Sequence, residues 1–149
     1  MIQFVAAKMN ATGFNEPMQR AIAGTHTGYL KVGDLTQGQG WELYTYPIGL
    51  DRLLVGNSPE MSFEANEVIR LGPPLPPLPN LPPQGTVLPN KPKSTAGFSA
   101  YVAFVPDKGI GIVMLVNKNC PISVRVMAAL AALRTLDGLT GGQPVARQN

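Results

Sequence analysis

The sequence lacks several features that would assign it to a large class of proteins. A single cysteine, Cys120, excludes an internal disulfide, and the single histidine, His26, has no companion ligands for a metal site. Charged residues make up 14% of the chain, the net charge is +3, and no basic stripe alternates with aromatics, so nucleic-acid binding is not expected. No apolar run reaches membrane-spanning length, since Gly109–Val116 has the size of a buried strand.

What the sequence does contain is enough apolar material for one folded domain. Its 149 residues are 44% hydrophobic, and a chain of this length buries a substantial core. The apolar spacing predicts short helices over Ile2–Met9 and Glu16–Ala23, the second ended by Gly24. The glycine-rich stretch 28–42 predicts a loop, and the alternation that follows predicts a strand over Gly40–Tyr46.

The middle of the chain carries weaker signals and an unusual proline content. Short strands are expected near Leu53–Val55 and Glu67–Leu71. Eight of the seventeen residues from Pro73 to Pro89 are proline, so this run is expected to form an extended surface loop outside any helix or sheet interior. The run also fits a PxxP ligand for an SH3-type groove, and composition does not separate that role from a rigid connection.

The last sixty residues have the clearest pattern. Phe98–Val105 and Ile110–Val116 are apolar on both faces of the pleat, and the turn Pro106–Gly109 joins them as an antiparallel hairpin. A helix is expected from Ser123, a favourable N-cap, to Asp137, with Gly138 as its C-terminal stop.

These elements predict an α+β fold. Residues 1–139 are expected to form an antiparallel sheet with a C-terminal helix packed on it, and residues 140–149 a tail. Because the two hairpin strands are apolar on both faces, the chain alone is expected to leave sheet surface uncovered and to form a homo-oligomer, at least a dimer.

A lysine-led motif, Lys91-Pro92-Lys93-Ser94-Thr95-Ala96-Gly97-Phe98, precedes the hairpin. It resembles the Lys-Thr-Gly signature that serine β-lactamases and penicillin-binding proteins carry on an edge strand beside the reactive serine. Three blocks of the sequence together resemble class C β-lactamases, the AmpC type. They are residues 31–42, residues 97–106, which continue the lysine-led motif, and residues 115–121 followed by Arg125-Val126. The resemblance runs from Met1 to Leu136 and corresponds to the C-terminal portion of that β-lactamase/transpeptidase-like fold.

The resemblance implies a role for five residues. Lys91 matches the lysine that recognises the substrate carboxylate, and Ser94 matches the residue whose backbone N–H forms half of the oxyanion hole. Thr95 matches a hydroxyl near the substrate carboxylate, and Asn119 and Arg125 match polar residues at the same end of the site. The ligand implied is a β-lactam or another carboxylate-bearing small molecule, and neither a metal nor a cofactor is implied.

The chain departs from the family pattern at positions close to the substrate. Pro92 and Lys93 replace the threonine and glycine of the signature, Ala96 replaces a glycine, and Ile122 stands where the family often has asparagine. The 149 residues contain neither a Ser-x-x-Lys nor a Tyr-x-Asn motif, so no catalytic set is complete.

Several of these residues also have simpler interpretations. Lys91 and Lys93 are typical of charges that protect an edge strand from aggregation. His26 is expected to be a hydrogen-bonded loop histidine, and Cys120 a small thiol that is not a nucleophile.

Two functions from different classes remain. The first is the C-terminal portion of a class C-like serine β-lactamase, inactive alone and dependent on a missing N-terminal half. The second is a non-catalytic binding or structural module on the same half-fold. Met1–Lys8 does not resemble a signal peptide, so a cytoplasmic location is expected if Met1 is the native start, whereas the family resemblance implies the periplasm.

Overall fold

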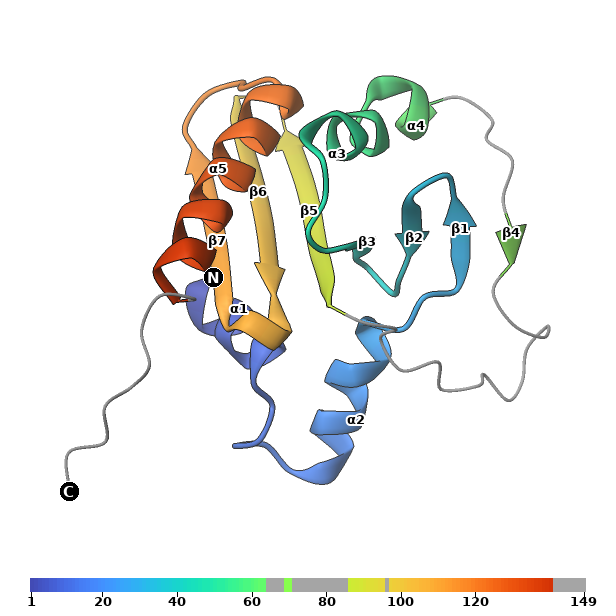
Figure 1. Ribbon diagram of the computed structural model, residues 1–149, viewed down its shortest axis with the longest axis vertical. Helices are drawn as coiled ribbons and strands as arrows, with labels where there is room; N and C mark the ends of the chain where they lie inside the picture. Colours follow the sequence, from blue (N-terminus) through green and yellow to red (C-terminus); the bar gives the residue numbers. More distant parts are fainter. Residues whose placement is uncertain (64–68, 71–85, 96, 141–149) are drawn as a thin grey trace.

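The computed structural model describes residues 1–63, 69–70, 86–95 and 97–140. The chain forms an α+β domain in which an antiparallel sheet, with strands of different lengths, carries helices on both faces (Figure 1). In chain order the elements are α1 (Ile2–Met9), α2 (Glu16–Thr25), β1 (Leu30–Val32), β2 (Leu35–Gln37), β3 (Glu42–Thr45), α3 (Leu50–Gly56), α4 (Pro59–Phe63), β4 (Ile69–Arg70), β5 (Val87–Thr95), β6 (Phe98–Val105), the 3₁₀ turn Pro106–Lys108, β7 (Ile110–Val116) and α5 (Ile122–Thr140).

Within the described residues the sheet has seven strands in the order β4-β1-β2-β3-β5-β6-β7, and the pairings between them are antiparallel. Helix α5 packs across β6 and β7 on one face, where Tyr101 and Val126 share a core with Leu88. Helix α1 covers part of the opposite face, where Val5 packs with Phe104 in a second cluster. Side chains on successive strand residues alternate between these two cores.

Strand β5 changes its pairing partner at Asn90. Strand β3 pairs with residues 87–90 of β5, whereas β6 pairs with residues 90–95, so Asn90 alone is paired on both sides. Pro89 and Pro92 therefore each have a strand partner on one side only, and the nitrogen that cannot donate can face the unpaired side. The expectation that the proline run to Pro89 stays outside the sheet interior is wrong at its end, because Pro89 is buried within β5.

Two other sequence expectations are wrong. The glycine-rich stretch 28–42 is not a plain loop, because β1 and β2 form a hairpin within it, turning at Gly33 with φ of 56°. The segment Leu53–Val55 lies in α3 and not in a strand, since a short apolar run fits either element.

The remaining expected elements are present, with shifted ends. Helix α1 has the expected bounds, and Asn15 caps α2 by accepting a hydrogen bond from the Met18 backbone N–H. Both Gly24 and Gly138 lie inside helices that were expected to stop there, and Ser123 lies in the first turn of α5 instead of capping it. Hairpin β6–β7 is confirmed, with Gly109 in the left-handed region at φ 63°.

Three sequence expectations fall outside the described residues. These are most of the proline-rich loop, the tail beyond Thr140 and the substitution at Ala96, while the strand expected near Glu67–Leu71 is described only as β4. Among the helices of the described ranges, none is long and apolar enough to cross a membrane.

Candidate functional site

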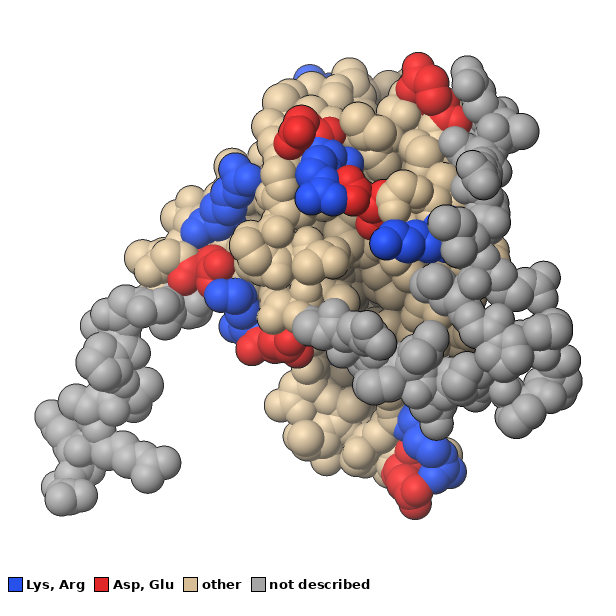
Figure 2. Space-filling model, turned by 45° about the vertical axis from the view of Figure 1, so that its right-hand side comes forward, with Lys and Arg blue, Asp and Glu red and all other residues tan. Residues whose placement is uncertain are grey.

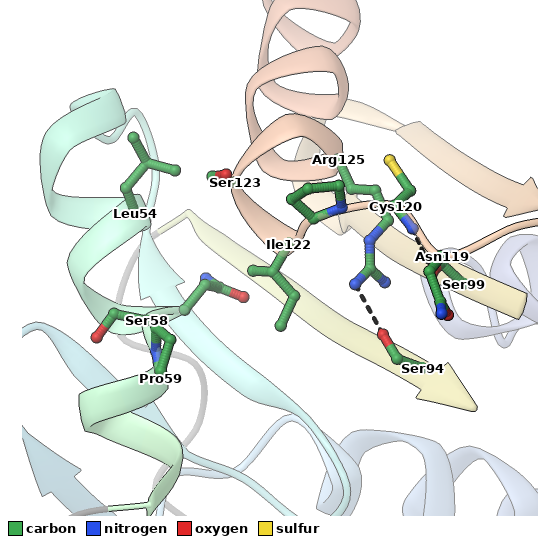
Figure 3. Close-up of a pocket in the computed structure, with 12 residues that line it drawn as sticks. Leu54, Ser58, Pro59, Ser94, Ser99, Asn119, Cys120, Ile122, Ser123 and Arg125 are labelled. Carbon is green, nitrogen blue, oxygen red and sulfur yellow. Dashed lines mark hydrogen bonds between the residues drawn. The ribbon is translucent and has the colours of Figure 1, made fainter. Parts of the chain in front are cut away.

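A pocket of about 770 Å³ lies where the end of β5 meets the start of α5 (Figure 3). Its other wall comes from the end of α3 and the start of α4, so segments far apart in the sequence enclose it. The lining combines apolar side chains with several serine and asparagine side chains and one arginine, so it offers both apolar contact and hydrogen-bonding groups to a small molecule. The residues that line it are Leu54, Asn57, Ser58, Pro59, Ser94, Ser99, Asn119, Cys120, Pro121, Ile122, Ser123 and Arg125.

Arg125 ties α5 to the strands that border this pocket. Its Nη2 donates to Ser94 Oγ at 2.8 Å, and its Nη1 donates to the backbone carbonyls of Lys93, at 2.8 Å, and Ala100. The side chain is 1% exposed. A buried guanidinium with several hydrogen bonds fixes its partners in place, so Arg125 holds the end of β5 against β6.

Lys91 lies three residues before Ser94 in β5 and forms an ion pair with the Glu42 carboxylate. Its Nζ is 3.1 Å from Glu42 Oε1, and both side chains are mostly buried. Burial raises the pKa of Glu42, while the ion pair with Lys91 opposes that rise. The strand lysine is therefore partly neutralised by an acidic neighbour on β3, a contact that the sequence motif did not indicate.

Residues 91–95 of β5 have β6 on one side and, within the described part of the chain, no strand on the other. Lys93, Ser94 and Thr95 are exposed there. A shallow groove of about 430 Å³ runs along this end of the sheet, between Lys93, Thr95, Phe98 and Leu115. The open side of an extended strand offers backbone donors and acceptors to a ligand, as in β-strand addition.

The turn before α5 is tied to the neighbouring strands by hydrogen bonds. Asn119 Oδ1 accepts from the Gly97 backbone N–H at 3.3 Å, and the Cys120 N–H donates to Ser99 Oγ at 3.0 Å. Cys120 is a partly buried free thiol. Ile122 lines the pocket with an apolar side chain where the family often has an amide.

The structure brings together some of the residues that the sequence singled out. Ser94, Asn119 and Arg125 line the same pocket, whereas Thr95 lines the neighbouring groove and Lys91 is turned to Glu42. Sequence reasoning missed the wall formed by Leu54, Asn57, Ser58 and Pro59, because the segment around it has no motif and was assigned the wrong secondary structure.

Two buried tyrosines of the sheet core, Tyr44 and Tyr101, do not supply a base in their described surroundings. Burial raises the pKa of Tyr44 and of Tyr101, so both hydroxyls stay protonated at neutral pH. Within the described residues, no group of three His, Cys, Asp or Glu side chains is arranged to hold a metal ion. Lys and Arg are interspersed with Asp and Glu over the face shown in Figure 2, without a continuous basic patch.

Comparison with known proteins places this arrangement in context. No protein-family model matches the chain. A β-lactamase from Pseudomonas fluorescens is 47% identical over 137 residues, which are 92% of this chain and 37% of that protein, and one from Lysobacter lactamgenus is 40% identical over 139 residues. The chain thus spans about a third of the length of these relatives.

Solved structures give the same result. The D-alanine carboxypeptidase AmpC from Burkholderia cenocepacia superposes with a TM-score of 0.77 at 49% identity, covering 89% of this chain and 36% of that one. A class C β-lactamase in complex with cefoxitin gives 0.76 at 43% identity, covering 90% and 35%. The resemblance stated from the sequence is therefore confirmed: this polypeptide is similar in sequence and in fold to about one third of the class C β-lactamases that it matches.

Proposed function

We propose that the chain supplies the substrate-binding portion of a class C β-lactamase-like site. The nucleophile would come from polypeptide outside these 149 residues. The observation that carries this proposal is the open side of β5 at residues 91–95, held by Arg125 beside a pocket of about 770 Å³. An open strand edge next to a pocket is suited to a ligand that pairs with backbone and buries its body.

In this role Ser94 acts through its backbone. Its N–H would be one donor of an oxyanion hole, and the hydrogen bond from Arg125 to its side chain limits the movement of that donor. Removal of one oxyanion donor typically lowers kcat by about 10²–10³, so the position of this single residue matters. Lys91, Thr95 and Asn119 would face the carboxylate end of the substrate.

The substrate class proposed is β-lactams, opened through an acyl-enzyme. A serine oxygen would attack the lactam carbonyl, the C–N bond would break with its nitrogen taking up a proton, and water would release the acid. Every one of these steps needs a serine activated by a base. Since the sequence contains neither Ser-x-x-Lys nor Tyr-x-Asn, the chain by itself is proposed to bind without turnover.

The chain alone provides a direct test. Incubation with a chromogenic cephalosporin should give no burst and no turnover, and intact-mass spectrometry should show no covalent adduct on the 15.9 kDa species. A complete class C β-lactamase treated in parallel provides the positive control. A stoichiometric acyl adduct on any serine of this chain would contradict the proposal.

The second candidate is a non-catalytic binding or structural module. Pro92 on the open side of β5, the exposed Lys93 and the pairing of Lys91 with Glu42 favour it, because each makes the strand less suitable for a carboxylate ligand. Amide shifts of Ser94, Asn119 and Arg125 on titration with a carboxylate-bearing boronate would favour the enzyme portion. An unchanged spectrum would favour the module.

A further inference from the structure

His26 lies where the end of α2 meets the sheet. It is the C-cap residue of α2, its backbone N–H donates to the Ala23 carbonyl, and its ring packs on Phe104 of β6 with ring centroids 5.6 Å apart. The side chain is 7% exposed, and its Nε2 is buried without a hydrogen-bond partner among the described residues. Such a place suits a neutral imidazole and disfavours an imidazolium, which is charged and has two N–H donors to satisfy.

Helix α1 brings a cation to the same place. The Lys8 Nζ donates to Thr25 Oγ1 at 3.1 Å, one residue before His26, and lies 5.3 Å from the centre of the Phe4 ring. Burial, and in addition the charge of Lys8, lower the pKa of His26 to about 4. A proton on His26 would therefore put two like charges into one partly buried junction.

The other described contacts of this turn bring no compensating negative charge. The Tyr29 hydroxyl donates to a carbonyl in the last turn of α2, and a Cβ at Gly38 would lie 3.0 Å from the Thr25 carbonyl oxygen. No carboxylate of the described residues opposes the effect of burial and of Lys8 on the pKa of His26. The junction is thus built for the neutral form of the histidine.

Aromatic rings join α1 to the sheet at this junction. Trp41, the one tryptophan of the sequence, packs edge-on against Phe104 with centroids 5.0 Å apart, and Phe4 of α1 stacks on Trp41 at 6.4 Å. Val5 of α1 is fully buried in the same cluster. Because α1 and α2 attach to the sheet through side chains (Figure 1), both helices can separate from it without breaking a strand pairing.

We propose that His26 is an acid-sensitive switch, whose protonation separates α1 and the end of α2 from each other and from β6 while β5, β6, β7 and α5 stay folded. Separation gives the imidazolium and the Lys8 ammonium access to water. Protons bind the open form with the ordinary pKa of 6.5 and the closed form with the pKa of about 4. The opening constant should therefore rise by about tenfold per pH unit below 6.5, up to about 300-fold in total.

The single histidine and the single tryptophan make this switch measurable on the full chain. NMR titration of the His26 Cε1 proton should give a pKa below 6.5. Between pH 6.5 and 4, Trp41 emission should shift to longer wavelength and become quenchable by acrylamide, while far-UV circular dichroism keeps most of its amplitude. From pH 7 to 5, hydrogen exchange corrected for intrinsic rates should accelerate by about 20-fold in residues 2–27, and much less in residues 98–116.

Glu42 provides the matched control, because burial raises its pKa and it adjoins Trp41, so its protonation can also change the tryptophan signal. Glu42→Gln should keep the transition and His26→Gln should abolish it. Lys8→Met should move the midpoint to lower pH, since it removes the repulsion in the closed form. A transition that persists in His26→Gln or disappears in Glu42→Gln would overturn the inference. On the wild type, which needs no variant to fold, a His26 pKa of 6.5 or above, unchanged exchange of residues 2–27, or equal acceleration in the sheet would do the same.

Discussion

Arg125 Nη2 and Ser94 Oγ are 2.8 Å apart, and this hydrogen bond joins the first turn of the C-terminal helix to the open end of β5. The same guanidinium donates to two strand carbonyls. The position of the proposed ligand-binding strand thus depends on one buried cation in α5.

Replacement of Arg125 should therefore destabilise the fold and not merely the pocket. Arg125→Ala removes three hydrogen bonds together with the buried side chain that makes them, so we expect the free energy of unfolding to fall by about 3 kcal/mol. Urea denaturation measures it. Arg20→Ala is the control, because Arg20 forms an exposed pair with Glu16 in α2 worth at most about 0.5 kcal/mol. Equal losses in the two variants would show that Arg125 is not a structural tie.

The contact between Gly56 and Tyr44 gives a second stability prediction. A Cβ at Gly56 would lie 2.1 Å from the Tyr44 hydroxyl oxygen, and that hydroxyl is buried without a hydrogen-bond partner within the described residues. Gly56→Ala should cost about 2 kcal/mol, and adding Tyr44→Phe should recover part of this loss. Gly24→Ala in α2 meets nothing within 4 Å and should be neutral or stabilising by about 0.5 kcal/mol. A Gly56→Ala variant as stable as Gly24→Ala would contradict the packing described.

His26 should make the fold sensitive to acid. It is buried against Phe104, its Nε2 has no hydrogen-bond partner among the described residues, and burial lowers its pKa to about 4. The unfolded chain binds this proton near pH 6.5 and the folded chain does not, so stability present above pH 6.5 is lost as the pH falls toward 4. From pH 7 to about 4.5 this residue should contribute about 2 kcal/mol of the loss. Unfolding curves of the wild type and His26→Gln should differ by that amount, and parallel pH profiles would contradict the assignment.

The environment of His26 also shows where sequence reasoning reached its limit. A polar segment between glycines predicts a hydrogen-bonded loop histidine, but the side chain is buried beside an aromatic ring of β6, nearly eighty residues away. Only the tertiary fold brings these segments together. Nε2 of His26 has no hydrogen-bond partner among the described residues, and whether the side chain is hydrogen-bonded at Nδ1 stays a prediction.

Elements with a strong local period were predictable, and elements defined by pairing were not. Helix α1 follows from its apolar spacing, and the β6–β7 hairpin follows from two apolar runs with the turn Pro106–Gly109 between them. The β1–β2 hairpin has three-residue strands, too short to show alternation, and its glycines indicated a loop. Pro89 and Pro92 are tolerated in β5 because the strand pairs with β3 up to Asn90 and with β6 from Asn90 onward. No local sequence pattern predicts this change of partner.

Pro92 and Lys93 provide a test of the ligand-binding strand. Pro92 removes a backbone donor from β5, and Lys93 places a long exposed side chain beside it. In protein complemented with an N-terminal fragment, Pro92→Thr combined with Lys93→Gly should tighten binding of a carboxylate-bearing boronate by about tenfold, the value of one good hydrogen bond. Calorimetric titration gives the affinity. The same affinity before and after the double change would show that these two residues are not the obstacle.

The most direct test of the central claim is complementation with the portion of the fold that this chain does not span. The N-terminal two thirds of a class C β-lactamase, carrying Ser-x-x-Lys and Tyr-x-Asn, would be mixed with this chain and assayed for nitrocefin hydrolysis. Hydrolysis that needs both polypeptides, and that is lost when Ser94 is replaced by proline to remove its backbone N–H, is the predicted result. A stable complex of the two polypeptides that never hydrolyses nitrocefin, even with Thr and Gly restored at positions 92 and 93, would contradict the account.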